Sequence, residues 1–205
     1  MPVLSKEVKS NIIIAHVRKG TGAEPSERNS HPFKHKNWIF AHNGQADGDY
    51  LKSLLNLEHK QALQGETDSE VYFHRLLQCA EEEQNIVKGI RKAIKKVLER
   101  DYGGLNFLLS DGLSLYAFRY TSKWERARYY SLYRLIRKPL EGGPAGFLSK
   151  ETQALIRSKS LKGERALLVC SEKLSDEEWI RIDLGKLLVV KSDLSFKETR
   201  IIRDL

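Results

Sequence analysis

Cysteines and long apolar runs are both scarce in this sequence of 205 residues. Its two cysteines, Cys79 and Cys170, are too few for the disulfide framework of a small secreted domain. No stretch comes near the ~18 consecutive apolar residues that a membrane-spanning helix needs. Residues 1–6 also lack the basic and then apolar layout of a signal peptide. These absences exclude the membrane and secreted mini-protein classes, and we expect a cytoplasmic protein with reduced thiols.

Charge, by contrast, is abundant. The chain has 35 Lys and Arg against 27 Asp and Glu, which gives a formal net charge of +8. The mean hydropathy is −0.48, yet 40% of the residues are hydrophobic, which is enough to build a core. The length, with no internal repeat and no clear linker, indicates a single domain over residues 1–205.

The apolar pattern predicts strands toward both ends of the chain and helices between them. Three consecutive isoleucines in 11–17 are typical of a strand buried on both faces. Thr67 or Asp68 is placed to cap a helix that runs through 71–77. The other expected elements are a strand at 38–42, helices over 47–61 and 83–100, a hairpin over 105–120, and strands at 165–170, 179–182 and 187–190. This order favours the α+β class with antiparallel sheets.

Three short segments combine polar groups with tight turns, and each has a plain alternative. Arg18 follows the first expected strand and opens a Gly-rich turn, so it is either a clamp for a carboxylate or half of a structural ion pair. Asn43 and Gly44 offer two donors for an oxyanion, or they form an ordinary hairpin turn. Asp68 binds an ammonium group, or it only caps its helix.

Taken together, these segments resemble the class II (Ntn-type) glutamine amidotransferases. The ordered motifs that carry the resemblance are AHVR at 15–18, NSHPF at 29–33, HNG at 42–44 and TDSE at 67–70. It continues through NFLLSDG at 106–112 and CSEKL at 170–174, although Lys173 stands where a proline is usual. The chain is most similar to the small stand-alone YafJ-like branch, which includes relatives that act on γ-glutamyl compounds.

The resemblance implies an Ntn-hydrolase-like αββα sandwich of antiparallel sheets, incomplete at the N-terminus, with glutamine or a γ-glutamyl small molecule as ligand. Arg18, with Thr21, would lie in the loop that closes over glutamine and would bind its α-carboxylate. Asp68 would hold the α-ammonium group. Asn43 and Gly44 would form the oxyanion hole of the catalytic site.

The same resemblance assigns the histidines to structural roles. His31 would support the pocket, and His16 and His42 would be hydrogen-bonded core histidines. It implies no cofactor, and the six histidines show no spacing typical of a metal site. We therefore expect neither a metal nor a cofactor.

One departure bears on activity. The family's nucleophile is an N-terminal cysteine whose own α-amino group serves as the base, whereas this chain begins with Met1 and Pro2. Three explanations fit this departure: a wrongly placed gene start, a separate polypeptide that supplies the missing segment, or a degenerate relative that is not catalytic. In each case we expect these 205 residues alone to be inactive as an amidotransferase.

A different class of function uses the positive charge. Basic residues with interleaved aromatics are typical of surfaces that bind RNA or single strands. The candidates are Lys88, Arg91, Lys92, Lys95 and Lys96 on one helix, and Arg119, Arg126, Arg128, Arg134 and Arg137 among Trp124, Tyr129, Tyr130 and Tyr133. A solvated helix face explains the same pattern, so we do not expect nucleic acid as a partner.

Overall fold

The computed structural model describes residues 10–17, 24, 26–122, 124–137, 145–148, 155–158 and 165–202. Arg18 and Thr21 lie outside the described residues. Within the described part, no helix has both the length and the apolar composition to cross a membrane.

An antiparallel sheet of six strands forms the middle layer of the molecule, in the order β1-β2-β3-β4-β10-β11. Its strands are β1 (Phe33–His35), β2 (Trp38–Gly44), β3 (Leu105–Ser110), β4 (Ser114–Arg119), β10 (Lys186–Lys191) and β11 (Phe196–Arg200). The β3–β4 hairpin places Phe107 opposite Phe118, and β10 then pairs with β4 from the far end of the chain. The centre of the sheet is therefore assembled from residues up to 80 positions apart, Leu108 and Leu188 each being the partner of Ala117.

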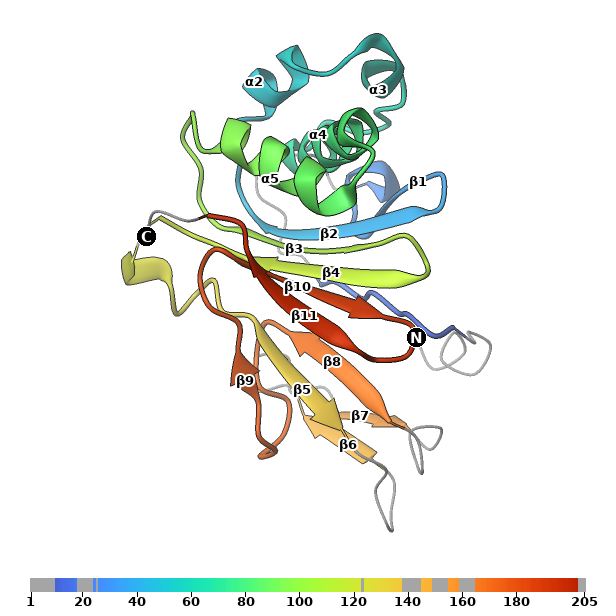
Figure 1. Cartoon of the computed structure of the whole chain (residues 1–205), viewed down its shortest axis with the longest axis vertical. Coiled ribbons are helices and arrows are strands. Elements are labelled where there is room, and N and C mark those ends of the chain that lie inside the picture. The colour runs from blue at the N-terminus through green and yellow to red at the C-terminus, as the bar shows by residue number, and fades with distance from the viewer. Residues whose placement is uncertain are drawn as a thin grey trace.

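Helices cover one face of this sheet, as Figure 1 shows. They are α2 (Gly48–Ser53), α3 (Leu57–Gln61), α4 (Asp68–Glu83) and α5 (Ile86–Val97), with 3-10 turns η1 (Glu27–Asn29) and η2 (Trp124–Arg126) elsewhere. Phe40 and Phe107 of the sheet are buried against Tyr72 and Phe73 of α4. Burial of large aromatic and aliphatic side chains stabilises this layer by roughly 1.5–3 kcal/mol for each one.

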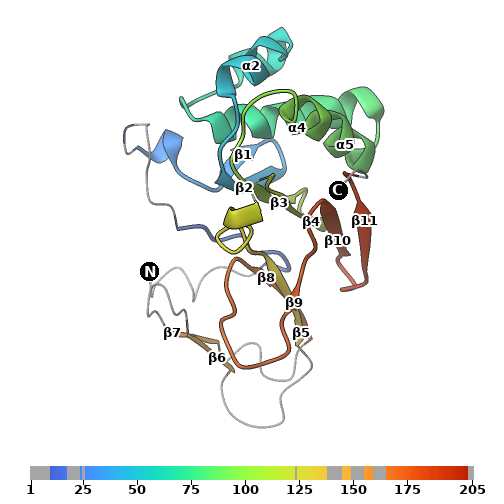
Figure 2. The same ribbon diagram turned by 90° about the vertical axis from the view of Figure 1, so that its left-hand side faces the viewer.

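Smaller sheets lie on the other face (Figures 1 and 2). One has the order β8-β5-β9, and the other pairs β6 with β7. Their strands are β5 (Tyr133–Arg137), β6 (Ala145–Leu148), β7 (Leu155–Ser158), β8 (Ala166–Cys170) and β9 (Ile180–Arg181). Ala117 and Leu188 of the main sheet pack with Leu132 and Ile182 in a second core. The described residues thus form a helix–sheet–sheet arrangement, with no second helical layer among them.

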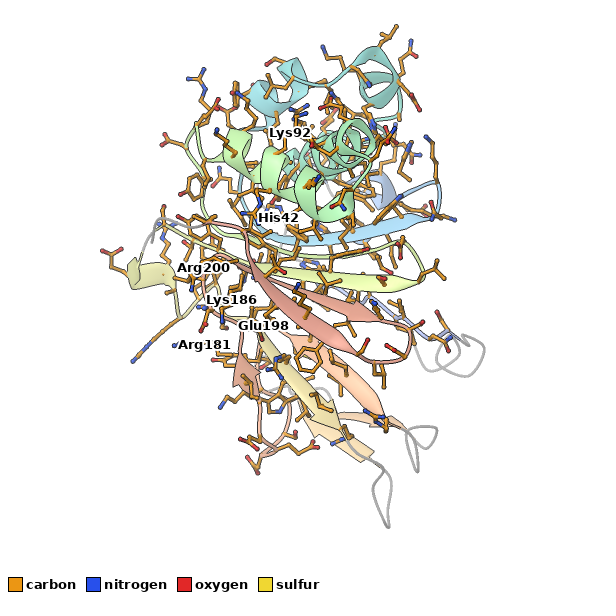
Figure 3. The ribbon with its side chains drawn as sticks, in the orientation of Figure 1. His42, Lys92, Arg181, Lys186, Glu198 and Arg200 are labelled. Carbon is orange, nitrogen blue, oxygen red and sulfur yellow. The ribbon has the colours of Figure 1, made fainter. Side chains whose placement is uncertain are left out.

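An ion-pair network also joins the main sheet to the three-stranded one. Glu198 of β11 accepts from Lys186 of β10 over 3.2 Å and from Arg134 of β5 over 3.1 Å. Figure 3 labels Lys186 and Glu198 where the two sheets meet.

Most of the expected elements are confirmed, with one correction and one refinement. The predicted strand over 11–17 is wrong, because among these residues only Ile14 is buried and no described strand pairs with them. A strand needs a neighbour for its amide groups, and the apolar run alone does not supply one. The helical stretch expected over 47–61 is present but divided into two short helices, α2 and α3, since Asn56 caps a new helix by accepting from the His59 amide.

A buried arginine holds the loop that leaves the main sheet. Arg119 at the end of β4 is only 3% exposed. It donates to the carbonyl oxygens of Tyr130, Ile182 and Ala127 over 2.8, 2.9 and 2.8 Å. Burial, and to a smaller extent the nearby Arg181, lowers the pKa of this guanidinium. The three carbonyl oxygens offset the cost of burying the charge.

We predict that Arg119→Leu lowers the free energy of unfolding by about 3–5 kcal/mol, because three buried carbonyl groups lose their donor. Arg128→Leu is the matched control, since Arg128 is exposed in the same loop, and it should change the free energy by less than about 0.5 kcal/mol. Urea denaturation measures both values. Equal effects of the two substitutions would show that Arg119 does not hold the loop.

Candidate functional site

The carboxyl end of β2 lies against the backbone that leads into β3. A Cβ atom on Gly44 would lie 1.6 Å from the Gly104 carbonyl oxygen, so only glycine fits there. The Gln45 amide donates to the same oxygen over 3.1 Å, and the Gly103 amide donates to the Gln45 carbonyl over 2.9 Å. β2 runs through Gly44 and the next element is α2. The alternative of an Asn-Gly hairpin turn is therefore wrong.

Asn43 lies directly before this contact and is paired with Asn106 across β2 and β3. It is half-buried, and no hydrogen bond joins its side-chain amide to the described part of the chain. The Asn106 side chain differs, because it accepts from the Tyr120 amide and donates to the Ser131 carbonyl. Of the two facing asparagines, Asn106 thus has a structural role, and the Asn43 amide has no hydrogen-bond partner among the described residues.

Asp68, the first residue of α4, lies beside the segment that follows Gly44. Thr67 is the N-cap, since its hydroxyl accepts from the Glu70 amide over 3.2 Å. The carboxylate of Asp68 instead accepts from the Ala46 amide over 2.8 Å. The capping alternative for Asp68 is thus not what the structure shows. Residues 43–46 and 68–69 together form what we call the β2–α4 corner.

His42 links the two sides of the β2–α4 corner and is labelled in Figure 3. Its ring is 2% exposed, with Nδ1 2.9 Å from the Ser69 hydroxyl and Nε2 3.3 Å from the Gly104 carbonyl oxygen. A carbonyl oxygen only accepts, so in the neutral ring Nε2 carries the proton and Nδ1 accepts from Ser69. The prediction of a hydrogen-bonded core histidine is confirmed for His42.

His31 lies between the N-terminal segment and the core. Its ring centroid is 4.5 Å from that of His16 and 4.6 Å from that of Phe33, which it meets edge-on. Phe33 is buried in the main core. This packing suits the supporting role expected of His31, which stays a prediction, as do the roles of Arg18 and Thr21 outside the described residues.

The sequence analysis did not predict that Tyr130 packs on Gly104, next to the β2–α4 corner. A Cβ atom on Gly104 would lie 2.1 Å from Cδ1 of Tyr130, so the Tyr130 ring covers Gly104 directly. Arg119 in turn holds the Tyr130 carbonyl. The Gly103–Gly104 pair is a sequence signal of close approach, but nothing in the sequence says that a tyrosine some 25 residues later makes it.

Both cysteines lie away from the β2–α4 corner. Cys79 is fully buried on α4 among the residues of the main core, and Cys170 ends β8 in the other sheet. Burial raises the pKa of Cys79, and burial together with the nearby Glu172 raises the pKa of Cys170 to about 11. Neither thiol has the position or the acidity of a nucleophile for this site.

The fold is that of the Ntn-type glutamine amidotransferases. The chain superposes on glutamine phosphoribosylpyrophosphate amidotransferase of Bacillus subtilis with a TM-score of 0.57 at 16% identity, over 93% of this chain and 35% of that one. It superposes on a glutamine aminotransferase class-II domain protein of Silicibacter pomeroyi with a TM-score of 0.57 at 26% identity, over 83% and 70% of the two chains.

The sequence then identifies the family. The family model of the class-II glutamine amidotransferases matches residues 3–200, and this chain belongs to that family. It is 31% identical to an uncharacterized protein of Methanocaldococcus jannaschii over 97% of this chain and 58% of that protein. It is 29% identical to YafJ of Escherichia coli over 87% of this chain and 69% of YafJ. The chain thus spans a little over half of the archaeal relative's length.

We predict that Gly44→Ala destabilises the chain by about 2–4 kcal/mol, because the new methyl group meets the Gly104 carbonyl. Gly112→Ala is the control, since Gly112 has a φ of +86° but nothing within 4 Å of its added Cβ atom. The control should lose only about 1–2 kcal/mol from backbone strain. Unfolding midpoints in urea compare them, and equal losses would mean that the close approach at Gly44 is relieved without cost.

We predict that both thiols are protected in the native chain. A pKa of about 11 leaves Cys170 with little thiolate at pH 8, and Cys79 lies inside the core. Alkylation by iodoacetamide, followed by mass spectrometry, should be at least ~10-fold slower in the native chain than in urea. A cysteine that reacts equally fast in both conditions would contradict this account of the thiols.

Proposed function

We propose that this chain binds glutamine or another γ-glutamyl compound at the β2–α4 corner, as the recognition part of a class II amidotransferase site. Asp68 holds the α-ammonium group of the ligand, and Asn43 with Gly44 donates to the oxyanion that forms at the γ-carbonyl. Arg18, with Thr21, binds the α-carboxylate. The reaction class is amide hydrolysis or transfer.

The observation that supports this proposal most is the 2.8 Å contact between the Ala46 amide and the Asp68 carboxylate. It holds the Asp68 carboxylate against the segment that directly follows Asn43 and Gly44. A ligand with an ammonium group and a polarisable carbonyl needs this combination of groups. The second oxygen of this carboxylate lies 3.4 Å from the Ser69 hydroxyl, a long contact, and we assign it to accept from the ligand.

The attacking thiol in this proposal is neither Cys79 nor Cys170, because both lie away from the corner. The 205 residues supply ligand recognition and the oxyanion donors, and a cysteine from another segment or another polypeptide supplies the nucleophile. A non-catalytic γ-glutamyl-binding protein is the second candidate. The two are distinguished by whether adding such a cysteine segment restores ammonia release.

A nucleic-acid partner finds little support in the basic residues. Lys92 lies 3.0 Å from Glu82 and 2.8 Å from Glu83, and Lys96 lies 2.9 Å from Glu99. Figure 3 labels Lys92 on the helical layer. Arg119 is buried, and Arg134 and Arg137 pair with Glu198 and Glu177. Several of the basic side chains are therefore already paired with carboxylates or carbonyl oxygens of the chain itself.

We predict that Asp68→Asn weakens glutamine binding by about 10–100-fold, because the charged partner of the ammonium group is lost. Asn43→Ala should change the affinity by less than about threefold, since its donor strengthens mainly as the oxyanion forms. Asp49→Asn, an exposed acidic residue of α2, is the control. Isothermal titration calorimetry of the 205-residue chain with glutamine and γ-glutamylglycine measures all three.

Two results would contradict the proposal. Unchanged binding by Asp68→Asn would place the ligand elsewhere. Release of ammonia from glutamine by the pure 205-residue chain would show that one of its own groups is the nucleophile. We expect ligand binding without turnover.

A further inference from the structure

Three histidines from separate elements converge within the helical layer. His35 ends β1, His59 lies on α3 and His74 lies on α4. One ring nitrogen from each lies within 4.8 Å of the other two. His59 and His74 are 0% and 2% exposed, and His35 is half-buried. Burying three imidazoles is costly unless their nitrogens have partners.

Two of the three histidines are hydrogen-bonded to each other through their Nδ1 atoms. His59 Nε2 lies 3.0 Å from the Glu81 carboxylate, which only accepts, so this nitrogen carries the proton of the neutral ring. Nδ1 of His59 then presents its lone pair toward Nδ1 of His74, which is 2.9 Å away. Only one proton fits between these two nitrogens.

His35 leaves a buried nitrogen unpaired beside this contact. Its Nε2 is shielded from solvent and has no hydrogen-bond partner in the described part of the chain. Its ring centroid is 4.8 Å from that of His74 and 5.8 Å from that of His59. An orphaned buried nitrogen needs an explanation, and a bound ion is one of the few that apply.

We propose that His35, His59 and His74 bind one Zn²⁺ ion through Nε2, Nδ1 and Nδ1. Imidazole is a preferred zinc ligand, and Zn–N bonds of about 2.0–2.1 Å in a tetrahedron need nitrogens about 3.3 Å apart. When the ion binds, the Nδ1 atoms of His59 and His74, which lie 2.9 Å apart, move slightly away from each other. His35, at the end of an edge strand, moves toward these two nitrogens. Water supplies the fourth ligand, and His74 then carries its proton on Nε2.

The surroundings have the composition of a zinc site. Glu81 orients His59 as the carboxylate partner that zinc-bound histidines ordinarily have. The charged groups near it are Lys36, Glu58 and Glu81, with Lys36 3.2 Å from Glu58 and 3.9 Å from Glu81. One cation and two carboxylates leave a net negative charge next to the ion. The site would join β1, α3 and α4, the helix whose first residue is Asp68.

The test uses the full chain, stripped of metal and titrated with Zn²⁺ or Co²⁺ alone. We expect one equivalent to bind, with the visible absorption of tetrahedral Co²⁺, and the melting temperature to rise with Zn²⁺ concentration. His35→Gln should weaken binding at least ~100-fold, because a ligand is lost. Glu81→Gln should weaken it about 10–100-fold while keeping all three ligands.

Two control variants make the result specific. His16→Gln removes a histidine outside the cluster, and Glu83→Gln removes an acidic residue from the same helix as Glu81. Both should bind Co²⁺ like the unchanged chain. The proposal is overturned if the chain binds no metal, or if His35→Gln and Glu81→Gln bind as tightly as their controls. Because Glu81 is half-exposed and outside the core, Glu81→Gln remains informative even if a histidine variant fails to fold.

Discussion

The close approach of Gly44 to Gly104 is the constraint on which the rest of the site depends. It removes any side chain from position 44 and brings the backbone after β2 within reach of α4. The Ala46 amide then meets Asp68, and His42 spans from Gly104 to Ser69. A strand end, the start of a helix and a loop are thereby joined to one another by hydrogen bonds of 2.8 to 3.3 Å. In this arrangement the side-chain amide of Asn43 has no hydrogen-bond partner within the part of the chain that the structure describes.

Residues later in the sequence hold the β2–α4 corner in place. Tyr130 covers Gly104, and Arg119 holds Tyr130 by its carbonyl oxygen. The same guanidinium holds Ile182, which packs in the second core. The β2–α4 corner is thus supported from both sheets, and under the proposed function this support would keep the binding groups in place before a ligand arrives. The thiols take no part in this, since Cys79 is buried on α4 and Cys170 is half-buried at the end of β8.

Local signals in the sequence predicted local structure well. The cap at Thr67 or Asp68, the helix over 83–100 and the hairpin over 105–120 depend on neighbours a few residues apart. The structure has Thr67 as the cap, α5 as the helix and β3–β4 as the hairpin. The strand over 11–17 failed because pairing depends on a partner strand, which the run of isoleucines does not specify. Asn43 and Asp68 were placed together only through the family resemblance. The cluster of His35, His59 and His74 shows no regular spacing, because its members come from three elements that tertiary packing alone brings together.

The most direct test of the central claim is an NMR titration of the labelled chain with γ-glutamylglycine. The account predicts that the backbone amide signals of Gly44, Ala46 and Ser69 shift together and saturate at a common ligand concentration. These amides belong to the two sides of one corner, so a ligand held between Asn43 and Asp68 must disturb all of them. Saturable shifts confined to another part of the chain, or no shifts at all, would contradict the assignment of the site.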